Sequence, residues 1–256
     1  MTPVRATAPN AAARFRPQGD LAAELGEIGP AADRAWLAGG LAGLVLAGLA
    51  AMVFPRHGVA IAYLSVLLRV AWYARVGEGT PLFGRLLRFG LVVGVFAILL
   101  DYVRAEALPH GRLVYLSRDA VLLTSPPYVP LGWACAVVEA GYLPLRLYGS
   151  LRGPRSGVAA AAVASVLAAV LAGLGMGTIE VLAVRAGWWK YEATGAMLAP
   201  AVAAYAPLGE GLAFLALVPA VLRSMRGGIL PWAIAFAAVA LAAQLLAWGV
   251  LHVVAG

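Results

Sequence analysis

The feature that most constrains this fold is a series of apolar stretches, each about 20 residues long and able to cross a bilayer as an α-helix. Of the 256 residues, 62% are hydrophobic and 12% are charged, whereas soluble domains carry about a quarter charged residues. Within the hydrocarbon core every backbone N–H and C=O must be bonded inside the protein, which a helix achieves within its own segment. The sequence therefore predicts an all-α integral membrane protein.

Seven of these stretches are expected to be transmembrane helices in one domain covering residues 36–256. The start of the fourth is irregular, because Pro126, Pro127 and Pro130 are crowded there, and we expect a broken or re-entrant turn before the helix enters near Pro127. The seven spans lie at about 36–54, 58–75, 87–105, 121–147, 157–184, 199–222 and 229–254.

The distribution of basic residues predicts the orientation of the chain. Residues 1–35 are rich in Ala, Pro and Arg and are expected to form a flexible tail, with one short amphipathic helix at Leu21–Ile28. They hold no apolar core typical of a cleavable signal peptide, so the first span is expected to be an uncleaved anchor. Lys and Arg are twice as frequent on the side of this tail as on the other side. Basic loops face the cytoplasm, which places the N-terminus inside and the C-terminus outside a bacterial-type plasma membrane.

Two stretches of the chain have nearly the same plan. In each, a carboxylate stands near the end of an apolar span, at Asp101 and at Glu180. A loop with Gly and aromatic residues follows, and then a Tyr-x-Pro-Leu-Gly step at Tyr128–Gly132 and Tyr205–Gly209. We interpret this as a parallel internal helix-loop-helix repeat of spans 3–4 and 5–6, which places both acids at a similar depth in the outer half of the membrane.

Four carboxylates fall inside the expected spans. Placing a charge in a bilayer costs about 2.5–3.5 kcal/mol on insertion scales, and such residues commonly face a cavity and serve function. We take Asp101, Glu180 and Glu210 as candidate catalytic residues, and Glu139, which lies deeper toward the cytoplasmic side, as a candidate substrate-binding residue. The alternative for each is a structural ion pair with an arginine such as Arg104.

Aromatic residues gather close to these acids in the sequence. Burial disfavours the charged form of a carboxyl, so a buried acid can act as a general acid. In an apolar cavity it can protonate an alkene or an epoxide, and aromatic faces attract the resulting carbocation. The alternative is an aromatic belt at the membrane surface. The candidate substrate-binding aromatic residues are Tyr102, Tyr115, Tyr128, Trp133, Trp188, Trp189, Tyr191 and Tyr205.

Other chemistries find little support in the residues. The three histidines are scattered and have no partners that resemble a metal site. The single lysine, Lys190, is expected in a loop, which argues against a retinal Schiff base. The net charge of +7 needs no nucleic acid, because membrane proteins concentrate basic residues in cytoplasmic loops. We therefore expect no metal, no organic cofactor and no nucleic-acid partner.

The stretch LDYVRAEALPHGRLVY…VPLGWA, followed by E-x6-GWWKYE, resembles the carotenoid biosynthesis proteins that include bisanhydrobacterioruberin hydratase. It is also similar to the integral-membrane lycopene cyclases and the membrane-bound terpene cyclases. The resemblance runs from Asp101 to Phe214 and implies that Asp101 and Glu180 occupy the two acidic positions of those families. Glu210, in PLGEG, matches only part of a Pro-Leu-Glu-Glu step, since Gly209 stands where that pattern has an acid.

The residues and the resemblance together lead us to expect a membrane-embedded isoprenoid (terpene or carotenoid) cyclase. It would protonate an alkene or epoxide with a carboxylic acid and stabilise the carbocation with aromatic side chains. The same protonation followed by attack of water would make it a carotenoid hydratase. A proton-coupled transporter or a non-catalytic membrane subunit is the alternative of another class. The expected partners are the lipid bilayer, an apolar isoprenoid, and either further copies of the chain or a second membrane subunit.

Overall fold

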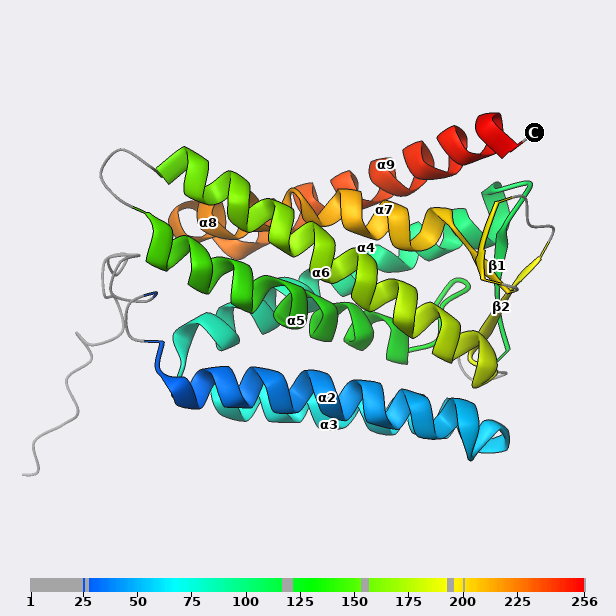
Figure 1. Ribbon diagram of the computed structural model, residues 1–256, viewed down its shortest axis with the longest axis horizontal. Helices are drawn as coiled ribbons and strands as arrows, with labels where there is room; N and C mark the ends of the chain where they lie inside the picture. Colours follow the sequence, from blue (N-terminus) through cyan, green and yellow to red (C-terminus); the bar gives the residue numbers. More distant parts are fainter. Residues whose placement is uncertain are drawn as a thin grey trace, which may run out of the picture.

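The computed structural model describes residues 25, 28–116, 122–152, 157–192, 196–199 and 201–255. The described chain is mostly helical, and its long helices run roughly along one axis (Figure 1). The prediction of an all-α architecture is thus confirmed for these residues. Most of the tail expected at residues 1–35, namely residues 1–24, 26 and 27, lies outside the described residues, and so does most of the short helix expected at Leu21–Ile28.

The helices correspond closely to the apolar stretches of the sequence. A 3₁₀ turn at Pro55–His57 joins the first two, and a π-helical turn at Val103–Ala107 continues α4. The helices are α2 Pro30–Met52, α3 Gly58–Gly77, α4 Pro81–Tyr102, α5 Tyr128–Leu151, α6 Gly157–Arg185, α7 Tyr205–Phe214, α8 Leu217–Gly227 and α9 Ile229–Ala255.

Five helices of the described chain are long and apolar enough to cross a membrane: α2, α3, α4 with its π-helical turn, α6 and α9. A sixth is added when α7 and α8, which meet at a bend of 42°, count as one span. These helices agree with an integral membrane protein. Helix α5 has 24 residues but contains Pro144, Glu139 and Arg146, and it is not among these candidates. Seven spans therefore remain a prediction.

Four helix starts differ from the expected spans. Helix α2 begins at Pro30 rather than at residue 36, so residues 30–35, which were expected in the tail, belong to this helix. Helix α4 begins at Pro81 rather than near residue 87, because proline has no N–H to leave unbonded in a first turn. Helix α5 begins at Tyr128 rather than at residue 121, since Leu122 and Ser125 bond to each other in a tight turn. Helix α7 begins at Tyr205 rather than at residue 199, after a short hairpin of β3 (Met197–Ala199) and β4 (Val202–Ala203).

A small antiparallel sheet covers the end of the bundle at which α4 and α6 finish (Figure 1). Strand β1 (Arg112–Tyr115) follows α4, and β2 (Trp189–Glu192) follows α6. Their register pairs Arg112 with Glu192 and Tyr115 with Trp189. The sheet therefore brings together two aromatic loops that are far apart in the sequence.

Glycines let α4 and α5 approach each other closely. A Cβ added at Gly94 would lie 2.1 Å from the carbonyl oxygen of Pro130, and one added at Gly90 would lie 2.8 Å from the Cα of Ala134. Small residues commonly allow such backbone approach between membrane helices. This contact fixes α5, which carries several of the candidate site residues, against α4.

Gly94→Ala is expected to destabilise the helix bundle by about 1–3 kcal/mol, the usual cost of overpacking a tight contact. Gly48→Ala on α2 is the control, because nothing lies within 4 Å of its added methyl group and alanine favours a helix over glycine by about 1 kcal/mol. Thermal unfolding of the purified protein in detergent measures both. An equal change in the two variants would contradict the close α4–α5 contact.

Candidate functional site

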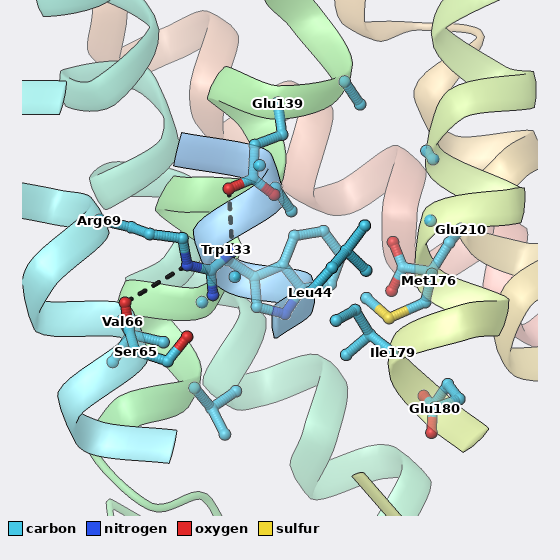
Figure 2. A pocket seen from close by; sticks show the side chains of 18 of the residues that line it. Leu44, Ser65, Val66, Arg69, Trp133, Glu139, Met176, Ile179, Glu180 and Glu210 are labelled. Carbon is cyan, nitrogen blue, oxygen red and sulfur yellow. Dashed lines mark hydrogen bonds and ion pairs between the residues drawn. The ribbon is translucent and has the colours of Figure 1, made fainter. Parts of the chain in front are cut away.

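A cavity of about 370 Å³ lies between the α2–α3 hairpin and the helices α5 and α6. The ends of α4 and α6 and the strands β1 and β2 close it at one end, and α7 contributes Glu210 and Phe214 to its wall. Its volume is within the range of 300–1,000 Å³ typical of small-molecule sites. Most of its wall is apolar or aromatic, and polar side chains stand at its two ends (Figure 2).

At the end closed by the sheet, Arg104 lies between two carboxylates. Its Nη1 is 3.5 Å from Oδ1 of Asp101, and its Nη2 is 3.3 Å from Oε1 of Glu180. All three side chains are buried. Asp101 and Arg104 are three residues apart, which places them on one face of a helix. The π-helical turn that holds Arg104 is of a kind often found at functional sites. We call Asp101, Arg104 and Glu180 the acid cluster.

Neighbouring side chains occupy the remaining oxygens of the acid cluster. Oδ2 of Asp101 accepts hydrogen bonds from the Tyr115 hydroxyl at 2.5 Å and from Oγ of Ser125 at 3.1 Å. Oε2 of Glu180 accepts one from Nε1 of Trp189 at 2.6 Å. Burial raises the pKa of the Tyr115 phenol well above its usual value, and the nearby Asp101 carboxylate raises it further, so Tyr115 stays a donor. Both acids are therefore fully bonded.

Two tyrosines hold Arg104 from the other side. Its Nη2 donates to the hydroxyl of Tyr191 at 2.5 Å. Its guanidinium carbon is 5.9 Å from the ring centre of Tyr191 and 5.7 Å from that of Tyr205, within range of a cation–π attraction. Burial also raises the pKa of Tyr191. These contacts fix the guanidinium in position between the carboxylates.

Glu210, on α7, has a different environment. The residue is 1% exposed and lines the cavity. Oε1 accepts a hydrogen bond from Nε2 of Gln244 on α9 at 3.3 Å, while Oε2 has no hydrogen-bond partner among the described residues. No cation bonds to it within the same residues. An uncompensated charge at such a depth costs several kcal/mol, so these surroundings stabilise the neutral acid.

Aromatic rings line the cavity next to these acids. Tyr128 and Trp188 have ring centres 6.5 Å apart, Trp188 and Trp189 are 5.9 Å apart, and Trp189 and Tyr115 are 5.9 Å apart. Trp133 stacks on Phe214 at 6.4 Å. In the view of Figure 2, Trp133 lies between Glu210 and the far end of the cavity. The cavity thus presents several electron-rich faces near three carboxyl groups.

The far end of the cavity carries a second ion pair. Nη1 of Arg69 on α3 is 2.9 Å from Oε1 of Glu139 on α5. The same oxygen accepts a hydrogen bond from the Tyr73 hydroxyl at 2.9 Å, and Nε of Arg69 donates to the backbone oxygen of Ser65 at 3.4 Å. Nε1 of Trp36 on α2 donates to the backbone oxygen of Glu139 at 2.8 Å. Three helices therefore meet at this pair.

The structure brings most of the predicted site residues to one cavity. Tyr102 does not line it and is 44% exposed, while Tyr191 and Tyr205 pack on Arg104 and are also absent from its wall. Those on the wall are Asp101, Tyr115, Tyr128, Trp133, Glu139, Glu180, Trp188, Trp189 and Glu210.

Three polar residues of the site were not expected from the sequence as site residues. Arg104 joins the two acids, Ser125 bonds to Asp101, and Gln244 bonds to Glu210. The sequence could have indicated Arg104 as a partner of Asp101, because it stands about one helical turn after that residue. It could also have indicated Gln244, which is an isolated polar side chain within the last apolar span. Ser125 had no distinguishing pattern.

Arg104→Met is expected to destabilise the protein by about 3–5 kcal/mol, because it leaves two buried carboxylates without a cation. Arg112→Met is the matched control: its ion pair with Glu106, at 3.2 Å, is exposed, and exposed pairs contribute about 0–1 kcal/mol. Thermal unfolding in detergent measures both variants.

Adding Asp101→Asn and Glu180→Gln to Arg104→Met should recover much of the lost stability, since no buried charge then remains in the cluster. A loss in Arg104→Met as small as that in Arg112→Met would contradict the arrangement of the acid cluster.

Residues 98–255 match the model of a family described as a domain of unknown function (DUF6989), and since this is more than half of the chain, the protein belongs to that family. No curated protein and no solved structure matches the chain. The matched region contains Asp101, Arg104, Glu180 and Glu210, and it begins after α2 and α3. The family's description assigns no activity to the site.

Proposed function

We propose that this member of the DUF6989 family is a membrane-embedded isoprenoid (terpene or carotenoid) cyclase that starts its reaction by protonating an alkene or epoxide. The observation that carries the proposal is the buried carboxyl of Glu210, a residue that lines an aromatic cavity and whose Oε2 has no hydrogen-bond partner among the described residues. Such a reaction requires a carboxylic acid that donates a proton, apolar surroundings, and aromatic rings that attract a cation. All three are supplied by side chains of this chain.

Glu210 is the proton donor in this proposal. The proton of its carboxyl group passes to one carbon of the substrate alkene and leaves a carbocation on the neighbouring carbon. With an epoxide, the proton passes to the oxygen, one C–O bond breaks with its electron pair going to that oxygen, and the carbocation forms on the released carbon. A second alkene of the same molecule supplies the electron pair that closes a ring. Loss of a proton from the cyclised cation, to Glu210 or through the acid cluster, gives a neutral product of unchanged mass. If water enters and bonds to the first cation, the same protonation gives a hydrated product.

The side chains of the acid cluster are fixed in position before the cation forms. Asp101 and Glu180 are held on either side of the Arg104 guanidinium, and each of their carboxyl oxygens contacts a donor. Fixed charges aimed at a developing charge are usually the largest single contribution to catalysis. The ring faces of Trp188 and Trp189, beside the acid cluster, attract a cation in the adjoining part of the cavity.

An apolar substrate is proposed to enter from the side, between α2 and α6. Leu37, Leu41 and Leu44 on α2 line the cavity and are also exposed, Leu41 by 51%. Gly175 on α6 also lines the cavity and is exposed. The cavity wall therefore continues to the outer surface of the helices, where the bilayer would lie.

The membrane arrangement proposed here has seven spans. Helix α5 runs alongside α6 over a similar length (Figure 1), and α7 with α8 forms one bent span. An odd number of spans puts the ends of the domain on opposite sides, with the N-terminus in the cytoplasm. The internal repeat is supported by the order of the elements, since α4 is followed by β1 and then α5, and α6 by β2 and, after the β3–β4 hairpin, α7. Each acid lies near the end of an apolar helix, and the strands that follow the two helices pair with each other.

Product profiling by mass spectrometry tests the proposed function. The full chain is expressed in a bacterial host that supplies linear carotenoids and epoxidised prenyl compounds, and is compared with Glu210→Gln at matched membrane levels. We expect a new isomer of unchanged mass in the wild type and a loss of at least about 100-fold in the variant, the usual contribution of a general acid. Asp101→Asn and Glu180→Gln should also reduce turnover.

Glu78→Gln is the control, because Glu78 pairs with Arg75 on the surface at the end of α3, away from the cavity. A product that gains one water, and is lost in Glu210→Gln, would identify a hydratase. Full turnover in Glu210→Gln would rule out Glu210 as the donor. Absence of any product, together with proton-coupled flux that depends on the carboxylates, would identify a transporter instead.

A further inference from the structure

We propose that the Arg69–Glu139 pair binds an uncharged polar group, a hydroxyl or a carbonyl, at the end of the substrate opposite the reacting alkene or epoxide. This inference rests on the proposed function, because it assumes that one molecule occupies the whole cavity. It names the substrate class more closely, as an amphiphilic isoprenoid rather than a pure hydrocarbon.

The ion pair leaves one nitrogen and one oxygen without a hydrogen bond to the described residues. Within the described part of the chain its hydrogen bonds use Nε and Nη1 of Arg69 and Oε1 of Glu139. Nη2 of Arg69 and Oε2 of Glu139 remain. Both residues and Ser65 line the cavity, and the two charged side chains are 12% and 26% exposed. The pair therefore differs from Asp101 and Glu180, whose oxygens are all engaged.

The charge of the pair selects a neutral ligand. Arg69 and Glu139 compensate each other, so a phosphate would meet the carboxylate of Glu139, and an ammonium group would meet the guanidinium of Arg69. A hydroxyl can accept from Nη2 and donate to Oε2 at the same time. A carbonyl can accept from Nη2 alone. An uncharged polar group fits both partners without leaving a buried charge unbalanced.

Three helices hold the pair in place before any ligand arrives. Tyr73 donates to Oε1 of Glu139, and Trp36 donates to its backbone oxygen. Gly43 on α2 makes room for the arginine, since a Cβ added there would lie 2.8 Å from its Nη1. Buried ion pairs are often no more stabilising than apolar residues of the same volume. A binding role accounts for a pair that packing alone does not require.

Two helices give the same distance between the two ends of the cavity. On α5, Tyr128 at the aromatic end and Glu139 are 11 residues apart. On α3, Gly58, whose added Cβ would lie 3.3 Å from Trp188, is 11 residues from Arg69. At 1.5 Å per residue both intervals span roughly 16 Å. An extended molecule that reaches from Arg69 and Glu139 to the aromatic end of the cavity is therefore about 16 Å long.

Equilibrium binding of two matched probes tests the inference. Radiolabelled geranylgeraniol, a C20 prenyl alcohol, is compared with the hydrocarbon in which a methyl group replaces its CH₂OH group. The full-length protein is held in nanodiscs, and binding to empty nanodiscs is subtracted. We expect the wild type to prefer the alcohol. The double variant Arg69→Met/Glu139→Gln should weaken alcohol binding roughly 10- to 100-fold, the usual effect of losing a hydrogen bond to a charged group, and leave the hydrocarbon unchanged.

The double variant removes both charges together, so that no unpaired charge is left to unfold the protein. Arg75→Met/Glu78→Gln is the matched control, because it removes an exposed Arg–Glu pair from the end of the same helix. It should keep the preference for the alcohol. Equal affinity of the wild type for the two probes would overturn the inference, as would an unchanged preference in the Arg69→Met/Glu139→Gln variant or saturable binding of neither probe.

A further ligand and a further variant distinguish this inference from the proposed function. Geranylgeranyl monophosphate should bind more weakly than the alcohol, and tighter binding that is lost in Arg69→Met/Glu139→Gln would overturn the assignment of a neutral group. Glu210→Gln should keep the alcohol preference while losing turnover. A preference for the alcohol combined with full turnover in Glu210→Gln would leave the binding site standing and contradict the proposed proton donor.

Discussion

The contact on which the rest of the structure depends is the one between Arg104 and the two carboxylates on either side of it. Neither Asp101 nor Glu180 can stay buried as an ion without a cation, because desolvation costs several kcal/mol per charge. One guanidinium serves both, which requires the ends of α4 and α6 to meet. The pairing of β1 with β2 makes the same connection through the backbone. The closed end of the cavity and the acid cluster are therefore one structural unit.

Two other carboxyl groups show how the surroundings assign different roles to the same chemical group. Glu139 has a cation at 2.9 Å and a tyrosine donor, which suit a charged side chain that orients a ligand. Among the described residues, Glu210 accepts a hydrogen bond only from the Gln244 amide, at 3.3 Å, which suits the neutral acid of the proposed function. Both line the same cavity. Pairs of acids whose environments differ in this way are a general sign of divided roles in a site.

Much of the fold could be predicted from the sequence, because a bilayer-length apolar stretch has essentially one backbone solution. Which face of each helix meets the cavity could not. Tyr102 and Asp101 are neighbours on α4, yet one is exposed and the other buried. Apolar residues surround such helices on all sides, so no polar stripe indicates their rotation. Likewise, Trp189 and Lys190 point to opposite faces of β2, and only the strand register decides which faces inward.

The two ends of the cavity come from different parts of the chain. The region shared with the DUF6989 family supplies Asp101, Arg104, Glu180, Glu210 and the aromatic wall, while Arg69 and Trp36 come from α2 and α3, which precede it. Glu139, within the shared region, needs Arg69 as its counter-ion. In the proposed function, the reaction is thus a property of the shared region, and selection of the substrate's polar end is a property of its junction with the preceding hairpin. Under the proposed function, changes in α2 and α3 would alter which molecule is held without moving the proposed proton donor.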